Sequence, residues 1–174
     1  MQPCLTLVMS EPSQELRMEI KGLMLDPSSD IPIVILKDTG SQLFLPIWIG
    51  VPEAKAIAIR IEGVELPRPM THDLLRSLVE TLGAHVEKIV ISDLKDNTFY
   101  ALIHLLRDGS TLTVDARPSD AIALALRARA PIFVEDKVID NAKTVDLAPE
   151  QGDSESLQKW LESLDPDDMS KYTM

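Results

Sequence analysis

Short apolar runs separated by turn residues fill the first third of the chain. Segments 16–25, 31–38 and 42–50 are continuously or alternately apolar over lengths typical of strands with at least one buried face. The stretch 51–63 differs, because its apolar residues recur at helical spacing, Pro52 suits a first helical turn, and a glycine ends the pattern. The pattern predicts three strands followed by a helix.

The second half repeats this order. Segments 85–94, 98–109 and 110–117 have strand character, and Asp-Asn and Asp-Gly pairs mark the turns between them. A helix is predicted to start at Pro118, and 131–136 is a last short strand. Because the two helices start at prolines and share an Ala/Ile/Leu-rich texture, we expect an internal duplication.

A further helix is predicted between the two units, over 71–83, with Thr71 as its N-cap and Gly83 as its end. Its apolar face consists of Leu74, Leu75, Leu78, Val79 and Leu82. The expected fold class is therefore α+β, with three strands and then a helix occurring twice and an extra amphipathic helix between the two units.

Charge limits the kinds of partner. The 174 residues carry a net charge of −11, and segment 144–174 contains eight acidic and two basic residues. Binding of nucleic acid by charge alone depends on a basic surface, and the chain has no Lys/Arg cluster. Any contact with DNA or RNA is therefore expected to be local, metal-assisted or weak.

The chain is expected to have a body flanked by two other segments. We expect a flexible N-terminus over 1–16, one domain over 17–143, and an acidic tail over 144–174 with a short helix around Leu157, Trp160, Leu161 and Leu164. No apolar run reaches the roughly 18 to 20 residues of a membrane span. The first residues are not expected to form a secretory signal, and Cys4 is the single cysteine. A cytoplasmic protein that does not contact membranes is expected.

The segment DARPSDAIALALR, residues 115–127, joins a charged entry to an almost wholly apolar helix. One interpretation is structural: Asp120 stabilises the helix start, and Asp115 pairs with Arg117 or across the sheet. The other is functional, because a helix N-terminus with an arginine and two carboxylates is suited to bind phosphate or a metal–phosphate group.

The segment PRPMTHDLL offers a second candidate. Asp73 could pair with Arg76, and a histidine such as His72 at the edge of an apolar face often only packs. However, a histidine beside a carboxylate can also act as a general base or a metal ligand. Arg68 and two prolines that stiffen the loop lie within the same few residues.

These two segments, together with LPIWIGVPEAKAIA, resemble the bifunctional nuclease domain family over roughly 17–143. The resemblance implies a duplicated α+β domain that self-associates and a proposed nuclease activity on DNA and RNA. The family motifs correspond to Gly50, Pro52, Glu53, Arg68, Pro69, Thr71, His72, Asp73, Asp115, Arg117, Pro118, Ser119, Asp120 and Ala121.

The first hypothesis is a hydrolase that cleaves phosphodiester bonds in DNA and RNA. The catalytic candidates are His72, Asp73, Asp115 and Asp120, of which the three aspartates are the candidate ligands for Mg²⁺ or Mn²⁺. The candidates for binding the substrate are Arg68, Arg117 and Ser119. This scheme requires the two motifs to converge in space.

The alternative hypothesis is a non-enzymatic, homo-oligomeric module for ligand binding or assembly. The acidic composition fits this hypothesis because it would repel nucleic acid. A concave site lined by both motifs would favour the enzyme. A closed network of ion pairs would favour the module.

Overall fold

The computed structural model describes residues 14–146 and Lys159. Its strands are β1 (Glu15–Leu25), β2 (Pro32–Asp38), β3 (Leu43–Trp48), β4 (His85–Lys95), β5 (Thr98–Arg107), β6 (Ser110–Ala116), β7 (Ile132–Glu135) and β8 (Val145–Asp146). Its helices are α1 (Val51–Ile61), α2 (Thr71–Thr81), α3 (Pro118–Ala128) and α4 (Asp136–Asn141). Most of the expected N-terminal segment, and the helix expected in the acidic tail, lie outside the described residues.

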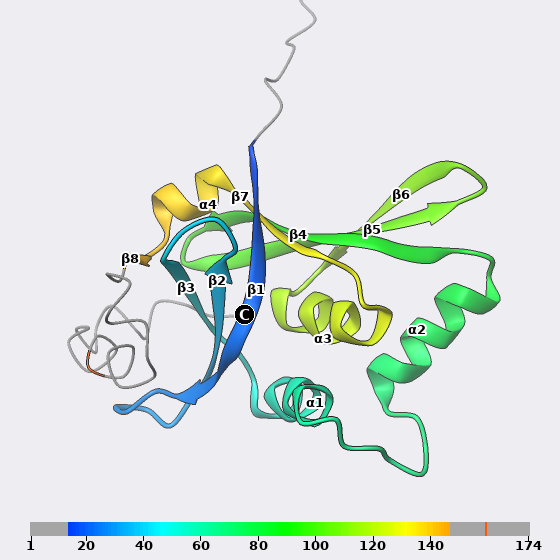
Figure 1. The fold of residues 1–174 in the computed structure, drawn as a ribbon, viewed down its shortest axis with the longest axis horizontal. Helices are drawn as coiled ribbons and strands as arrows, with labels where there is room; N and C mark the ends of the chain where they lie inside the picture. The colour runs from blue at the N-terminus through cyan, green and yellow to red at the C-terminus, as the bar shows by residue number, and fades with distance from the viewer. Residues whose placement is uncertain (1–13, 147–158, 160–174) are drawn as a thin grey trace, which may run out of the picture.

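The strands form one sheet with the order β6-β5-β4-β7-β1-β2-β3-β8 (Figure 1). Strands β1, β2 and β3 form one antiparallel meander that leads into α1. Strands β4, β5 and β6 form a second meander that leads into α3. Strand β7 joins the meanders, parallel to β4 and antiparallel to β1. The expected α+β class and the repeated order of three strands and a helix are confirmed.

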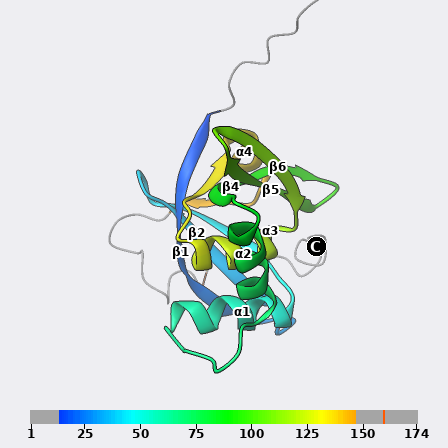
Figure 2. The same ribbon diagram turned by 90° about the vertical axis from the view of Figure 1, so that its right-hand side faces the viewer.

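Helices α1, α2 and α3 lie together on one side of the sheet, with α3 in the middle (Figures 1 and 2). Helix α3 packs against both other helices and against β4 and β5. All residues from Ala121 to Ala125 are at most 1% exposed. The alanines in this run let neighbouring elements approach the helix closely, so α3 forms the centre of the core. The charged first turn of α3 is therefore held in place by buried neighbours.

Helix α2 differs from the sequence expectation in two ways. Its N-cap is Met70 rather than Thr71, and the side chain of Asp73 accepts a hydrogen bond from the Met70 backbone N–H at 2.9 Å. Moreover, most of its apolar face is exposed rather than buried. Val79 packs against the core, whereas four leucines remain more than one-third exposed: Leu74, Leu75, Leu78 and Leu82. Helix α2 packs on α3 along one edge of this face, where the buried His72 and Val79 lie two turns apart.

Strands β2 and β3 bury both of their faces, as their continuous apolar runs indicate. Helix α4 has no counterpart in the sequence prediction, because its six residues are too few to show a helical period. Among the described residues, no helix is both long and apolar enough to cross a lipid bilayer.

Candidate active site

Helices α1 and α3 begin with the same local geometry. Their N-caps, Gly50 and Arg117, have φ/ψ values of −71°/153° and −69°/144°, and each helix has a proline within its first two residues. Extended backbone at the N-cap and a proline just inside the helix fit a helix start, since the N–H that proline lacks has no partner within the helix. The third residue after each N-cap is a carboxylate, Glu53 in α1 and Asp120 in α3.

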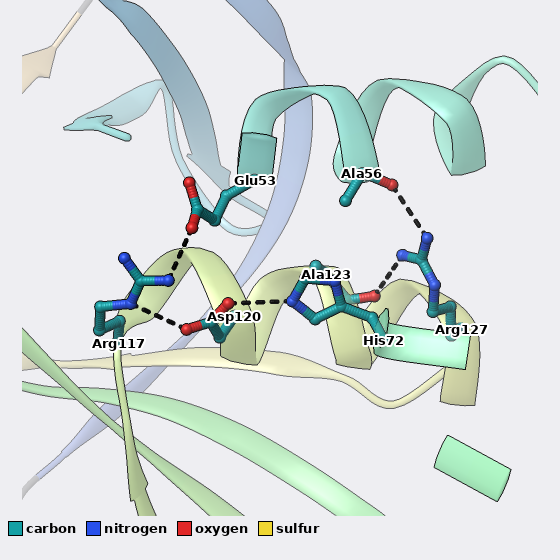
Figure 3. Close-up of polar contacts among 7 residues, drawn as sticks. All are labelled: Glu53, Ala56, His72, Arg117, Asp120, Ala123 and Arg127. Carbon is teal, nitrogen blue, oxygen red and sulfur yellow. Dashed lines mark hydrogen bonds and ion pairs between the residues drawn. The ribbon is translucent and has the colours of Figure 1, made fainter. Parts of the chain in front are cut away.

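Arg117 binds both of these carboxylates (Figure 3). Its Nε donates to Asp120 Oδ2 at 2.9 Å, and a terminal nitrogen donates to Glu53 Oε1 at 2.7 Å. Gly50 contributes by having no side chain, because a Cβ at that position would overlap the Glu53 carboxylate. One guanidinium therefore connects the first turns of the two duplicated helices.

His72 extends this network to α2. Its Nε2 lies 2.9 Å from Asp120 Oδ1, although the two residues are 48 positions apart. The His72 side chain is 10% exposed and lies in the first turn of α2, which the hydrogen bond from the Met70 N–H to Asp73 stabilises. The two charged segments singled out in the sequence therefore converge, and Glu53, Arg117, Asp120 and His72 form a continuous chain of polar contacts, here called the His72 cluster (Figure 3).

The His72 cluster favours an ionised Asp120. Burial opposes the charge, but hydrogen bonds from His72 and Arg117 outweigh it and hold the pKa of Asp120 below the ordinary value of 3.8. The hydrogen bonds to Asp120 and Glu53 in turn raise the pKa of Arg117. The cluster therefore contains a carboxylate that stays charged and can orient a histidine ring.

A second ion pair lies beside the cluster. Arg127, in the last turn of α3, has a side chain that is only 1% exposed, and its Nε donates to Asp73 Oδ1 at 2.8 Å. Its terminal nitrogens donate to the backbone carbonyls of Ala123 at 2.9 Å and Ala56 at 3.2 Å (Figure 3). Arg127 thereby ties all three helices together. Asp73 pairs with Arg127 and not, as the structural interpretation had it, with Arg76.

The side chains of the remaining sequence candidates make no hydrogen bond or ion pair with the His72 cluster in the described residues. Asp115 of β6 lies opposite Leu102 of β5, whereas its neighbour Ala116 packs on the core. Strand alternation therefore directs Asp115 to the sheet face away from α3. Arg68 lines a cavity on the other side of Asp73. Ser119 is fully buried, and its Oγ has no hydrogen-bond partner among the described residues. The catalytic and binding roles of these residues stay predictions.

The three aspartates expected to bind a metal ion do not converge. Asp120 binds His72 and Arg117, Asp73 binds Arg127, and Asp115 faces away. Within residues 14–146, no three His, Cys, Asp or Glu side chains are grouped as metal ligands. The two carboxylates that do face each other, Glu53 and Asp120, share the Arg117 guanidinium. This donor set does not fit a metal ion held by three protein side chains.

Sequence reasoning underrated two residues of the site. Glu53 lies three positions after an N-cap, as Asp120 does, and this shared spacing in the two duplicated helices was the available signal. Arg127 lies in the last turn of an apolar helix, where a basic residue is common because it interacts favourably with the helix dipole. Its partner Asp73 is 54 positions away, and only the packed structure brings the two together.

Comparison with known proteins gives one family. A family model described as "Bifunctional nuclease domain" matches residues 34–146. An uncharacterized protein from Mycobacterium tuberculosis strain H37Rv is 38% identical over 160 residues, which covers 86% of this chain and 94% of that protein.

Plant proteins match more distantly. "Bifunctional nuclease 1" of Oryza sativa subsp. japonica is 29% identical over 142 residues, or 78% of this chain and 43% of the rice protein. "Bifunctional nuclease 1" of Arabidopsis thaliana is 26% identical over 130 residues, or 68% of this chain and 40% of that protein. The match thus covers less than half of each plant protein.

Proposed function

The chain belongs to the bifunctional nuclease domain family, and we propose that it hydrolyses phosphodiester bonds of DNA and RNA at the His72 cluster. The observation that most supports this proposal is the 2.9 Å contact between His72 Nε2 and Asp120 Oδ1. It places a histidine and an ionised carboxylate, supplied by two separate motifs, in the arrangement that general acid–base catalysis uses.

Asp120 orients the histidine. With Nε2–H donating to the carboxylate, the other ring nitrogen, Nδ1, carries the lone pair that accepts a proton. His72 then serves as the general base. The oxygen of a water molecule forms the new bond to phosphorus, and its proton passes to Nδ1. The ester oxygen leaves with the electrons of its bond to phosphorus and takes a proton from solvent.

Arg117 is the group that binds the reacting phosphate. Its side chain is 48% exposed, and an arginine presents several donors in one plane to phosphate oxygens. Glu53 and Asp120 hold the guanidinium from two sides, so little side-chain entropy is lost when the phosphate binds. Asp73 has a positioning role in this proposal, because it starts α2 and anchors it to Arg127.

Mg²⁺ or Mn²⁺ would supply charge neutralisation on the phosphate if either takes part in the reaction. Since the donors within residues 14–146 do not form a three-residue site, no step of the proposed reaction is assigned to a metal ion.

The test is a cleavage assay on highly purified protein with single-stranded DNA and RNA, with added Mg²⁺ or Mn²⁺ and with EDTA. Asp120→Asn is expected to reduce the cleavage rate about 100-fold or more, because general acid–base catalysis contributes at least about 100-fold to a rate. The matched control, Asp108→Asn, removes a carboxylate that is 88% exposed in the β5–β6 hairpin and is expected to cleave like the unmodified protein. Equal rates in the two variants would refute this site.

A homo-oligomeric binding or assembly module is the second candidate function. One supporting observation is that the charges of the His72 cluster pair with one another. Another is the outer edge of the sheet, where Leu112 and Val114 of β6 are 48% and 45% exposed on the side that carries the helices. The sequence of β6 has no lysine, proline or bulge to prevent another strand from pairing with it.

The partner best suited to this edge is a second copy of the chain. An antiparallel β6–β6 pair centred on Thr113 would place Leu112 opposite Val114 and Thr111 opposite Asp115. Like charges would not face each other in that register. The exposed leucines of α2 lie on the same side of the sheet and add apolar surface (Figure 1). Self-association is compatible with either function.

A further inference from the structure

A cavity of about 280 Å³ is lined by both members of the Asp73–Arg127 pair, and Asp73 directly follows His72 in the sequence. The last turn of α1 and the loop that follows it form one wall, which includes Arg60, Glu65 and Arg68. Asp73 of α2 and Arg127 of α3 form the other. The cavity is therefore built from the same three helices as the candidate active site.

Two arginines on the cavity wall are available to a ligand. In the part of the chain that the structure describes, neither Arg60 nor Arg68 makes an ion pair within 4 Å or a side-chain hydrogen bond, and both are exposed. The charge of Arg60 is nevertheless close enough to contribute to the lowered pKa of Asp73. Arg127 and Asp73 neutralise each other, and Glu65 is the remaining acid of the lining. The cavity lining therefore has a net positive charge of one, in a chain whose overall net charge is −11.

The rest of the lining is largely apolar. Ile59, Val64, Leu66 and Pro69 contribute to it, and Val64 and Leu66 are 44% and 43% exposed. Apolar surface beside two unpaired guanidinium groups suits a ligand that combines a phosphate with a sugar or a base. A nucleotide unit within a strand has this composition.

From this geometry we infer that the cavity binds a backbone phosphate of the nucleic-acid substrate, with Arg60 and Arg68 as its contacts. This phosphate flanks the cleaved phosphate on the same strand. The inference rests on the proposed nuclease function. Asp120 and Arg127 are seven residues apart on α3, which is about 10 Å along the helix axis. One strand can therefore reach both sites, and the substrate is a strand of several nucleotides rather than a single one.

This site also reconciles nucleic-acid binding with the acidic composition. A strand is attracted at one cavity with unpaired arginines and not by the overall charge of the surface, so binding is local and consists of few phosphate contacts. Each such contact contributes to the salt dependence of affinity, about 0.7 to the slope of log K against log salt concentration for a single strand.

The test measures binding of a fluorescein-labelled single-stranded oligonucleotide by fluorescence anisotropy over a range of salt concentrations, with the oligonucleotide recovered intact. Arg60→Ala, Arg68→Ala and the double variant are compared with Arg107→Ala, which removes an exposed arginine of the β5–β6 hairpin. The double variant is expected to bind at least about tenfold more weakly and to lower the salt slope by about 0.7, which is one phosphate contact. Arg107→Ala is expected to match the unmodified protein.

A second substrate locates the contact. An oligonucleotide with one uncharged methylphosphonate linkage beside the cleavage position should bind the unmodified protein more weakly but bind the double variant with no further loss. Equal affinity and slope in the double variant and in Arg107→Ala would overturn the inference. If cleavage still depends on Asp120 in that case, the proposed function stands without the cavity. A protein that neither binds nor cleaves any oligonucleotide overturns both.

Discussion

Glu53 and Asp120 bind the same guanidinium, that of Arg117, from equivalent positions in two duplicated helices. The duplication produced two similar helix starts, but their N-caps differ, glycine in α1 and arginine in α3. The arginine provides the positive charge that allows two carboxylates to face each other. The glycine provides the space in which Glu53 lies. The site is thus an asymmetric product of a repeated local structure.

Removing this guanidinium should change how the protein binds metal ions. In Arg117→Gln, Glu53 and Asp120 lose their shared counterion, and oxygen ligands of this kind bind divalent cations. We expect the variant to bind Mn²⁺ about tenfold more tightly than the unmodified protein does, or about 1.4 kcal/mol. Titration of free Mn²⁺ followed by electron paramagnetic resonance, without nucleic acid, measures this. Tight binding to the unmodified protein would contradict the geometry.

Arg127 should contribute to stability more than any exposed arginine. Arg127→Met would leave Asp73 and the carbonyls of Ala56 and Ala123 without their buried donor. Leaving a buried polar group without its partner costs about 1–3 kcal/mol of unfolding free energy. The two carbonyls are expected to carry most of this loss, because the Asp73 side chain is 33% exposed. Urea denaturation measures the loss. Arg107→Ala is the control and should stay within about 0.5 kcal/mol of the unmodified protein, because its side chain is 53% exposed. Similar values for the two variants would contradict the assigned role of Arg127.

Asp73 and Asp120 should make the fold sensitive to acid. For Asp73, burial raises the pKa, but the Met70 N–H and the charge of Arg127 outweigh it, and the resulting pKa is lowered, as for Asp120. A lowered pKa in the folded state means that the unfolded chain binds more protons below about pH 4. The stabilisation is present above that pH and is lost as the pH falls through the folded-state values.

The unfolding free energy is measured by urea denaturation between about pH 2 and about pH 6, the range in which carboxylates titrate. Asp73→Asn and Asp120→Asn should each show a shallower decrease toward low pH than the unmodified protein and Asp108→Asn. Curves of the same slope for all four proteins would mean that these carboxylates are not stabilised by their partners.

How much of this structure could be predicted from the sequence depended on how far apart along the chain the interacting residues lie. The helices after Pro52 and Pro118, strands β1 to β7 and the repeated order were predictable, because local periodicity and turn residues determine them. The two-residue strand β8 was not predicted, because it is too short to show a period. The burial of α3 was also predictable from its lack of a polar face. Helix α4 was not, since it spans six residues.

The site was predictable only as two separate candidates. His72 and Asp120 stood out as residue types, but their contact spans 48 positions and depends on how α2 packs on α3. The same packing explains why the leucines of α2 are exposed. Their stripe marks the apolar face correctly, but only its edge, with His72 and Val79, is covered. Periodicity reveals that an apolar face exists and not what covers it.

The exposed apolar residues of edge strand β6 and helix α2 predict that the protein self-associates as its concentration rises. Leu112→Lys would place a charge on the open edge strand β6 and should shift the protein toward the monomer, because a lysine on an edge strand disfavours pairing. Sedimentation velocity over a range of protein concentrations measures the shift. Leu25→Lys, which adds the same charge at an exposed leucine at the end of β1, away from this edge, is the matched control. An unmodified protein that is monomeric throughout would contradict assembly through this edge.

The central claim is that His72 and Asp120 act as one catalytic unit, and a double-mutant cycle tests it most directly. The rate of cleavage of single-stranded DNA and RNA is measured for the unmodified protein, His72→Gln, Asp120→Asn and the double variant, each shown to be folded by circular dichroism. If Asp120 works by orienting His72, the double variant is no slower than His72→Gln, because residues that act together are not additive. Losses that multiply in the double variant, or no loss in either single variant, would contradict the account.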